Sequence, residues 1–280
     1  MAFSAPVAEQ NFVLKHIVGI DALAQHARFA DATPDMVQAI VEGIGAFAEG
    51  EFAPLNRIGD TVGARLVNGK VVMPEGFVAA YKSYVANGWG SINAPAEFGG
   101  QGLPFSLATV ALDSLGGANM AFALCHLLTQ GQIYALQKSA SPELQNIFIP
   151  PMVEGRWTGT MNLTEPQAGT DLAGIKSRAV PNGNHYLISG QKIYITYGEH
   201  DMAENIIHLV LARTPDAPHG IKGISVFIVP KFLADDDGNF TKPNDLRCLS
   251  IEKKLGIKGS PTAVMQYGET DGAIGYLVGQ

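Results

Sequence analysis

The chain has 280 residues, of which 46% are hydrophobic and 16% are charged, and its formal net charge is −7. A chain of this length predicts about two domains and can bury roughly three-quarters of its unfolded surface, so it needs no disulfide staples. The acidic balance disfavours nucleic acid and anionic bilayers as ligands, because both are bound by basic surfaces.

The cysteines and the N-terminus indicate the compartment. Cys125 and Cys248 are far apart in the sequence and form no CxxC pair. We therefore expect no disulfide framework and a reducing, cytoplasmic setting. The opening MAFSAPVAEQNF has neither the basic start nor the apolar stretch of a secretory signal.

The first half of the sequence predicts helices. Thr33–Asp35 supplies an N-cap, a first-position proline and a first-turn acid, and the apolar residues after it recur at helical spacing. A second helix is expected after Pro74 and a third from Ser141. The Pro150-Pro151 pair should end the third helix early.

The segment Ser114–Gln137 contains no Asp, Glu, Lys or Arg, as a membrane span would. Polar residues and glycines interrupt it throughout, so we expect a pair of buried helices and no integral membrane segment. Within it, His126 is interpreted as a hydrogen-bonded core or pocket-lining residue. The glycine-rich Asn93–Pro104 is interpreted mainly as a turn between helices. Four apolar residues could line a pocket or fill a core: Phe105, Leu107, Phe122 and Leu124.

After about Gly155 the sequence changes to short β-branched and aromatic runs between turn-forming residues. Pro181–Asn184 has the composition of a hairpin turn, and Asp235–Asp245 that of an exposed loop. The three clearest strand segments are Ile206–Leu211, Ile224–Val229 and Ala263–Tyr267.

Helices followed by strands, without alternation, predict an α+β chain instead of a βαβ sheet. We expect a lead segment over residues 1–32 and an N-terminal helical domain over residues 33–155. A middle β-barrel or sandwich domain should follow over residues 156–280.

Two segments are the most informative about function: MNLTEPQAGTDLAGIKSRA at Met161–Ala179 and GQKIYITYG at Gly190–Gly198. Their small residues let a backbone approach a flat or charged ligand, and their threonines offer short hydroxyls. Tyr194 lies two residues before Thr196, so on an extended strand both side chains would face the same way. An aromatic plate beside a hydroxyl suits a planar cofactor such as a flavin.

The pattern LTEPxAG(S/T)D followed by GxK(aromatic)IT resembles the acyl-CoA dehydrogenases. Supporting matches are GWGSINAPAEFGGQGLP at 88–104, NIIHLVLAR at 205–213 and GISVFIVPK at 223–231, so that the resemblance covers Phe47 to Gly279 in the family's order. The opening APVAEQNFVLKHIVGIDAL is similar to the lead segment of the subgroup that includes 3-methylmercaptopropionyl-CoA dehydrogenases.

The resemblance implies FAD-dependent α,β-dehydrogenation of an acyl-CoA thioester. In that reaction a base removes the Cα proton while hydride leaves Cβ for the flavin N5 atom. It also implies an electron-transfer flavoprotein as electron acceptor and a homo-oligomer in the full-length protein.

The same resemblance places the cofactor. Backbone groups at Met161 and Leu163 and the hydroxyl of Thr164 would contact the polar edge of the flavin ring. Tyr194 would pack on the ring, and Thr196 would lie near N5. Read singly, the two threonines and the tyrosine are ordinary strand composition; only the combined motif favours the cofactor role.

By resemblance, Gly169 and Thr170 approach the pyrophosphate and the thioester arm of CoA, which makes Thr170 a substrate-binding residue as well. Thr170 replaces the more usual serine and keeps the hydroxyl. Glu165 and Asp171 could form an acid–base pair, but their position on a turn-rich segment favours capping and bracing of the loop.

In the family, a four-helix C-terminal domain follows the strands and carries the glutamate that removes the α-proton. No segment of residues 1–280 matches it, so the sequence predicts a truncated chain with no catalytic residue of its own. Such a chain would expose a broad apolar face, bind FAD weakly and be inactive alone.

Other functions stay open at this point. A flavin oxidase or monooxygenase could use the same scaffold, and a non-catalytic subunit or remnant could bind FAD or CoA esters. His200, Glu204 and His208 would share one helix face, but they lie on or near a predicted strand, so no metal site is expected. No GxGxxG follows a strand, and no P-loop is present.

Overall fold

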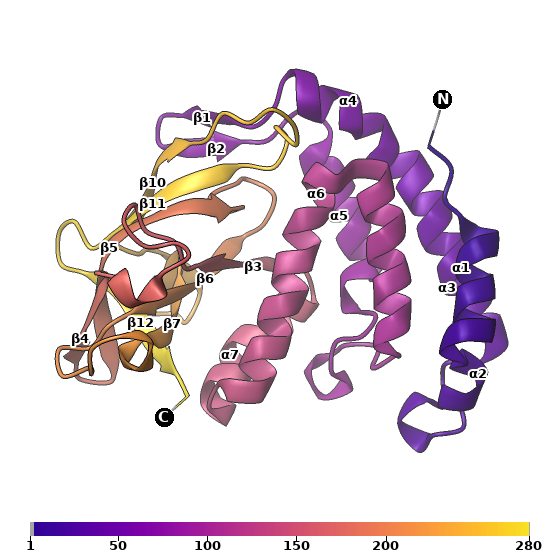
Figure 1. Ribbon diagram of the computed structural model, residues 1–280, viewed down its shortest axis with the longest axis horizontal. Coiled ribbons are helices and arrows are strands. Elements are labelled where there is room, and N and C mark those ends of the chain that lie inside the picture. Colours follow the sequence, from indigo (N-terminus) through magenta and orange to yellow (C-terminus); the bar gives the residue numbers. More distant parts are fainter. Residues whose placement is uncertain (1–2, 280) are drawn as a thin grey trace.

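The computed structural model describes residues 3–279 (Figure 1). Helices make up one side of the molecule and strands the other, which confirms the α+β class; a small hairpin, β1 (Arg65–Val67) with β2 (Lys70–Val72), lies within the helical part of the sequence. The α-helices are α1 (Val7–Val13), α2 (Ile20–Leu23), α3 (Pro34–Phe47), α4 (Ala53–Thr61), α5 (Phe77–Ala86), α6 (Phe105–Ser139) and α7 (Pro142–Val153).

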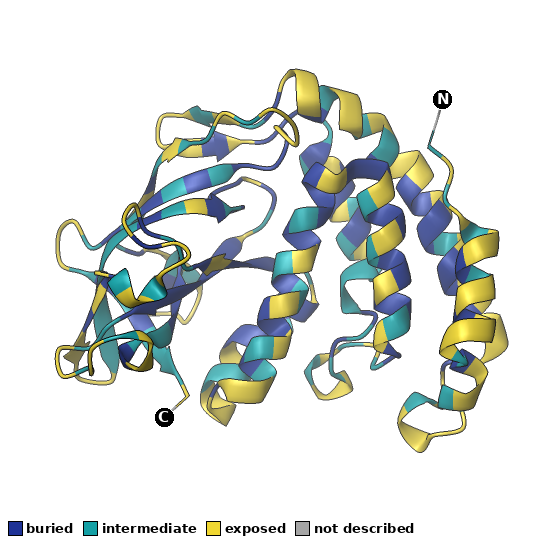
Figure 2. Ribbon diagram, in the orientation of Figure 1, coloured by how far each residue is buried: buried dark blue, intermediate teal, exposed yellow. Residues whose placement is uncertain are grey.

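The predicted helix start at Thr33 is confirmed. The Thr33 hydroxyl oxygen accepts a hydrogen bond from the Met36 N–H at 3.3 Å, and Pro34 takes the first helical position. Along α3 the apolar stripe faces the other helices, whereas the outer face is exposed (Figure 2). Its buried members are Val37, Ile40, Val41, Ile44 and Phe47.

The uncharged stretch of α6 forms two helices, as expected. Asn119 has non-helical dihedrals (φ −158, ψ 87) and breaks α6 there. Its side chain accepts from the Phe122 N–H at 3.2 Å and donates to the Phe52 carbonyl at 3.3 Å, so it caps the second arm. Among residues 3–279, α6 taken across this break is the one helical segment long and apolar enough to cross a membrane, and 61% of its most apolar window is buried within the structure.

The expectation that Pro150 and Pro151 end their helix early is wrong, because α7 continues to Val153. Proline lacks an N–H and disrupts a helix chiefly in its interior. These two prolines lie in the last turn, so the helix loses only the two hydrogen bonds that their missing N–H groups would donate, and it ends two residues later. The Pro150 carbonyl still accepts from the Glu154 N–H at 2.9 Å.

An aromatic stack fills the centre of the helical part. The rings of Phe52 and Phe122 lie 4.2 Å apart between centroids and 5° from parallel, and Phe77 stacks on Phe122 at 4.9 Å. All three side chains are buried. Stacked pairs of this kind contribute about 1 kcal/mol each beyond the burial of their surface. The stack therefore fixes α5 and the second arm of α6 against each other.

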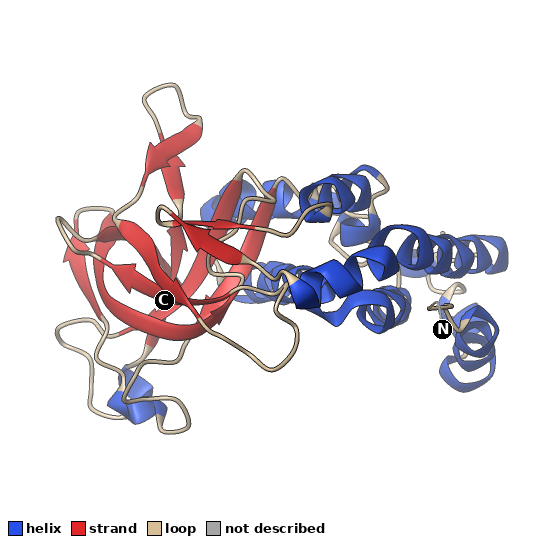
Figure 3. Ribbon diagram, turned by 90° about the horizontal axis from the view of Figure 1, so that it is seen from above, coloured by secondary structure: helices blue, strands red, loops and turns tan. Residues whose placement is uncertain are grey.

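The β part consists of one curled sheet of eight strands, with a separate two-stranded sheet beside it (Figure 3). The order is β10-β11-β5-β12-β7-β6-β3, with β4 also paired to β5. Only β3 and β6 run parallel, and β3 lies at one end of the order. The strands are β3 (Trp157–Asn162), β4 (Arg178–Asn182), β5 (His185–Thr196), β6 (Asn205–Ala212), β7 (Ser225–Pro230), β10 (Leu246–Ile251), β11 (Thr262–Tyr267) and β12 (Ala273–Val278).

The three predicted strands are confirmed as β6, β7 and β11. The predicted hairpin turn is also confirmed, because Asn182 pairs with His185 across it and Gly183 has φ 64. Asp235–Asp245 is not a loop throughout. Within it β9 (Phe240–Pro243) pairs with β8 (Phe232–Ala234), and the Phe240 ring lies 4.6 Å from that of Trp157.

Two buried histidines stabilise the strand half through neutral hydrogen bonds. His208 Nδ1 lies 3.2 Å from the Asn162 amide nitrogen and 3.0 Å from the Tyr267 hydroxyl. His200 Nε2 lies 2.9 Å from the Thr158 hydroxyl. Burial lowers the pKa of each imidazole to about 3, so both rings are neutral near pH 7.

Candidate functional site

The motif strand β5 contains a bulge at Tyr194. Lys192 pairs with Met265 and Ile195 with Ala263, so two residues of β5 face one residue of β11. Tyr194 accordingly adopts φ 59. We expected Tyr194 and Thr196 to face the same way because both would lie on a regular extended strand. That assumption is wrong, because the strand is bulged at Tyr194. The bulge leaves the tyrosine 61% exposed at the sheet surface.

The structure brings the two motif segments together at this bulge. The Ile193 N–H donates to the Thr164 carbonyl at 2.9 Å. The Thr160 hydroxyl donates to the Thr196 carbonyl at 2.7 Å, which joins β3 to the end of β5. A Cβ on Gly169 would lie 3.4 Å from Thr164 Cγ2, so the turn that contains Gly169 packs close to Thr164.

The outer edge of β3 offers backbone donors beside these threonines. The Gly159 N–H donates to the Thr129 hydroxyl of α6 at 3.1 Å, away from β6. Backbone N–H groups on a strand alternate in direction with a period of two residues. The Met161 N–H therefore points to the same open side, and the Met161 side chain is 43% exposed. This edge is suited to oxygen acceptors of a ligand.

Beneath the motif lies a buried ion pair. Lys192 Nζ lies 2.8 Å from Glu165 Oε1 and donates to the Leu163 carbonyl at 3.1 Å, and the side chains of Lys192 and Glu165 are 0% and 3% exposed. Glu165 also accepts the N–H groups of Lys176 at 2.7 Å and Ser177 at 3.0 Å. Burial opposes ionisation of Glu165, but Lys192 and the N–H donors outweigh it and lower its pKa to about 2. Glu165 is thus a bracing residue.

The rest of the TEPQAGTD segment is a turn. Glu165 and Ala168 exchange backbone hydrogen bonds at 2.8 and 3.0 Å. Asp171 Oδ1 accepts the Ala173 N–H at 3.0 Å and so caps the short helix that follows, in line with the expected capping role. Gly169 and Thr170 are exposed on this turn.

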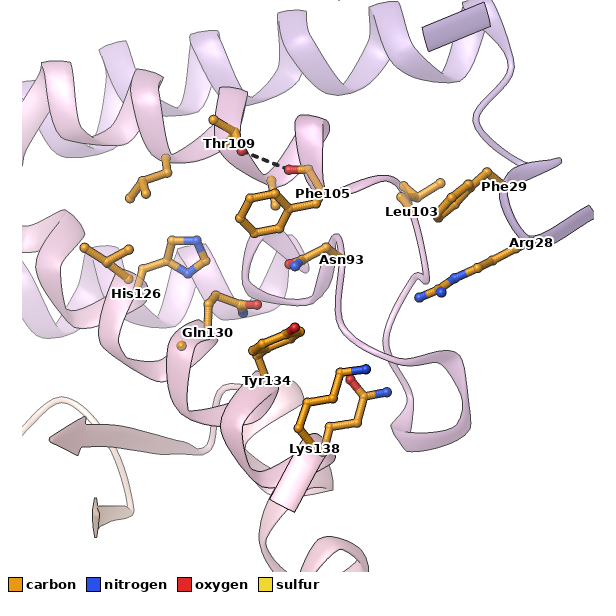
Figure 4. Close-up of a pocket in the computed structure, with 15 residues that line it drawn as sticks. Arg28, Phe29, Asn93, Leu103, Phe105, Thr109, His126, Gln130, Tyr134 and Lys138 are labelled. Atoms are coloured by element: carbon orange, nitrogen blue, oxygen red, sulfur yellow. Dashed lines mark hydrogen bonds between the residues drawn. The ribbon is translucent and has the colours of Figure 1, made fainter. Parts of the chain in front are cut away.

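A cavity of about 720 Å³ lies between the two arms of α6 (Figure 4). Its walls also include the loop before α6 and the end of the lead segment. Asn93 and Leu103 come from that loop, while Gly100 packs on the Ala94 carbonyl, so the loop both turns the chain and lines the cavity. The remaining lining residues are Arg28, Phe29, Phe105, Ala108, Thr109, Leu112, His126, Leu127, Gln130, Gly131, Tyr134, Gln137 and Lys138.

His126 is the buried titratable residue of this cavity. Its Nδ1 pairs with the Tyr84 hydroxyl, and burial lowers its pKa to about 4, so the ring is neutral near pH 7. Both expected roles, hydrogen-bonded and pocket-lining, are confirmed. Of the four apolar candidates, Phe105 lines the cavity, Leu107 and Phe122 fill the core, and Leu124 packs against that core.

His200, Glu204 and His208 do not form a ligand set. The two histidines bind the side chains described above, and Glu204 accepts from Arg156 at 3.1 Å. Within residues 3–279 no group of three or more His, Cys, Asp or Glu residues could hold a metal ion.

Sequence reasoning missed two pairings in these sites. It assigned Glu165 a bracing role but did not find its partner Lys192, and it did not connect Tyr84 with His126. Lys192 lies between Gln191 and Ile193, and these neighbours gave no signal that its side chain is buried. No local pattern indicated the second, because its partners are 42 residues apart.

Comparison with known proteins decides the family. The family model for the N-terminal domain of acyl-CoA dehydrogenases matches residues 35–156, and the model for the middle domain matches residues 160–269. The chain belongs to the acyl-CoA dehydrogenase family. The two matches join at the point where helices give way to strands.

This acyl-CoA dehydrogenase chain is similar to the 3-methylmercaptopropionyl-CoA dehydrogenase of Ruegeria pomeroyi. The two are 48% identical over the whole of this chain, which covers 47% of that relative. The chain thus spans about half the length of this curated relative.

Two solved structures share the fold. One is the electron transferring flavoprotein of Acidaminococcus fermentans, described in connection with flavin-based electron bifurcation, with a TM-score of 0.70 and 25% identity over 89% of this chain and 58% of that one. The other is an acyl-CoA dehydrogenase from Bacillus anthracis complexed with FAD, with a TM-score of 0.68 and 21% identity over 90% of this chain and 38% of that one.

Proposed function

We propose that this chain binds FAD and takes part in the α,β-dehydrogenation of an acyl-CoA thioester. The observation that carries the proposal is the convergence of Thr164, the Tyr194 bulge and the Thr196 end of β5 beside the open edge of β3. Support for FAD comes from the FAD complex of the Bacillus anthracis relative.

The residues of this site would bind and orient the flavin. The open N–H of Met161 and the hydroxyls of Thr164 and Thr196 are donors for ring oxygens and nitrogens. The exposed Tyr194 side chain offers an apolar face for a planar ring. Bound FAD would supply the hydride acceptor for the reaction. Thr170, exposed on the neighbouring turn, is proposed to contact the CoA thioester.

The base of the reaction is proposed to come from outside residues 1–280. The carboxylates of the motif are already engaged, Glu165 with Lys192 and Asp171 with the Ala173 N–H. A carboxylate whose pKa is lowered to about 2 is a poor acceptor for a carbon-bound proton. By this proposal the 280 residues alone do not turn over substrate.

The acyl chain is proposed to enter the cavity between the arms of α6. A volume of about 720 Å³ lies in the range of small-ligand sites, and Phe105, Leu112 and Leu127 provide apolar surface. The similarity to a 3-methylmercaptopropionyl-CoA dehydrogenase supports a short acyl thioester as substrate. We further propose an electron-transfer flavoprotein as acceptor, a homo-oligomer and a cytoplasmic location.

Flavin spectroscopy tests the proposal. The chain, incubated with FAD and followed anaerobically, is expected to bind the flavin and to keep it oxidised when 3-methylmercaptopropionyl-CoA is added. The lack of a free base explains the second result. Dithionite, which reduces any accessible flavin, is the control.

Absence of FAD binding contradicts the cofactor proposal. Bleaching by the thioester contradicts the proposal that the base lies outside these residues. A bound, oxidised flavin also agrees with the alternative of a non-catalytic FAD-binding subunit. That alternative is excluded if the thioester reduces the flavin after a helical domain that carries a glutamate is added.

A further inference from the structure

We propose that Lys192, held by Glu165, is a positioning residue that aims the backbone N–H of Thr164 at the flavin ring. The proposal rests on the proposed function, because it assigns a task to residues beneath the same site. It concerns how the site is held in shape and adds no group that touches substrate.

The geometry begins at the Leu163 carbonyl. Lys192 Nζ donates to this oxygen at 3.1 Å from below the motif. In a trans peptide the carbonyl of one residue and the N–H of the next point in opposite directions. An inward Leu163 carbonyl therefore fixes an outward Thr164 N–H, and that N–H makes no hydrogen bond within residues 3–279.

The same lysine also fixes the bulge. Lys192 immediately precedes Ile193, whose N–H donates to the Thr164 carbonyl at 2.9 Å, and Tyr194 follows. One ammonium group thus connects the segment that carries Thr164 to the segment that carries Tyr194. Any movement of Lys192 would change the distance between Thr164, which carries the proposed hydrogen-bond donor to the flavin ring, and Tyr194, which is proposed to stack on that ring.

Glu165 anchors the lysine to a third segment. Its carboxylate oxygens accept the N–H groups of Lys176 and Ser177 at 2.7 and 3.0 Å, and Lys192 Nζ lies 2.8 Å away. The chain is tight here, because a Cβ on Gly190 would lie 2.9 Å from Ser177 Cα. Three backbone segments therefore meet around two buried charges.

A positioning role explains why this pair is ionic. Removing two charges from water is unfavourable, and an apolar pair of similar volume is often as stable. An apolar pair, however, cannot donate to the Leu163 carbonyl. The ion pair therefore contributes orientation of that peptide more than net stability.

The experiment separates orientation from stability with three variants. Lys192→Met removes the donor and leaves Glu165 buried without its cation, so it is expected to lower stability as well as FAD affinity. Lys192→Met with Glu165→Gln removes both charges and is expected to recover much of the stability. Lys192→Arg keeps a cationic donor and is expected to retain most of the FAD affinity.

The readouts are the FAD dissociation constant from flavin fluorescence and the urea midpoint. The double variant is expected to bind FAD about tenfold more weakly than the wild type despite its recovered stability, as when an outer-shell partner of a bound group is lost. The control is Arg247→Met with Glu269→Gln, which removes an exposed ion pair between β10 and the segment after β11, outside both motif segments, and should leave FAD affinity unchanged.

The outcomes distinguish the two proposals. If the wild type binds FAD and the double variant binds it equally well, the positioning role is overturned and the proposed function stands. If the wild type itself fails to bind FAD, the proposed function falls.

Discussion

Acidification from pH 7 to pH 5 is expected to lower the free energy of unfolding by about 6 kcal/mol, about 2 kcal/mol for each of three buried histidines. His126 has a pKa of about 4, and His200 and His208 have pKa values of about 3. Burial is the cause in each case, because it disfavours the charged imidazole. A loss of this size is a large part of the stability of an ordinary domain.

The direction follows from proton binding. Below an ordinary histidine pKa of about 6.5, the unfolded chain binds protons that the folded chain rejects. The stability is therefore present above that pH and is lost as the pH falls toward the folded values. Glu165, with its lowered pKa, adds a loss only below its ordinary value of 4.5. Burial raises the pKa of Glu199, which offsets part of the loss, but three histidines act in the opposite direction and set the sign between pH 7 and pH 5.

Urea titrations at pH 7 and pH 5 measure this effect. The variants His126→Gln, His200→Gln and His208→Gln should each reduce the difference between the two pH values by about 2 kcal/mol, because glutamine does not titrate there. Equal unfolding free energies at both pH values in the wild type would show that the histidines are not neutral and buried.

Gly190→Ala is expected to destabilise the fold by about 3 kcal/mol or more. Gly190 has φ 140, a backbone conformation that L residues rarely adopt. A Cβ there would lie 2.3 Å from Ser177 Oγ and 2.9 Å from Ser177 Cα, so the backbone of Ser177 would have to move. Because the Ser177 N–H binds Glu165, that movement would reach the motif.

Chemical denaturation of this variant and of Gly183→Ala provides the measurement. Gly183 also has positive φ (64), but no atom lies within 4 Å of its Cβ position. The control should therefore lose only the dihedral contribution, about 1 kcal/mol. Similar losses in the two variants would contradict the close approach of Gly190 to Ser177.

Much of the fold could be predicted because its signals are local. The Thr33 cap, the three strand runs and the turn at Gly183 each depend on neighbouring residues, and each appears where expected. The change from helices to strands predicted the α+β class for the same reason. The resemblance to the acyl-CoA dehydrogenases, and not local propensity, predicted one site for Thr164 and the β5 residues, and the structure joins these segments by hydrogen bonds.

The failures arise where distant partners decide the structure. The bulge at Tyr194 is set by the register of β5 against β11, which no property of the β5 sequence specifies. Lys192 is buried only because Glu165, which is 27 residues away, neutralises it. Phe240 lies in a strand that pairs with β8, and its ring packs near those of Trp157 and Phe148. Local propensity cannot report such contacts.

FAD titration of the Tyr194→Ala variant tests most directly whether Thr164, Tyr194 and Thr196 form a flavin bed, that is, the surface on which the flavin ring is proposed to lie. Tyr194 is 61% exposed, so its removal should leave the fold intact. Tyr134→Ala is the matched control, because Tyr134 is 63% exposed on α6 and lines the cavity instead of the motif. We expect Tyr194→Ala to raise the FAD dissociation constant about tenfold, because one stacked ring is lost. We expect Tyr134→Ala to leave the FAD dissociation constant unchanged. Equal FAD affinity in the wild type and the Tyr194 variant would contradict a flavin bed at the β5 bulge.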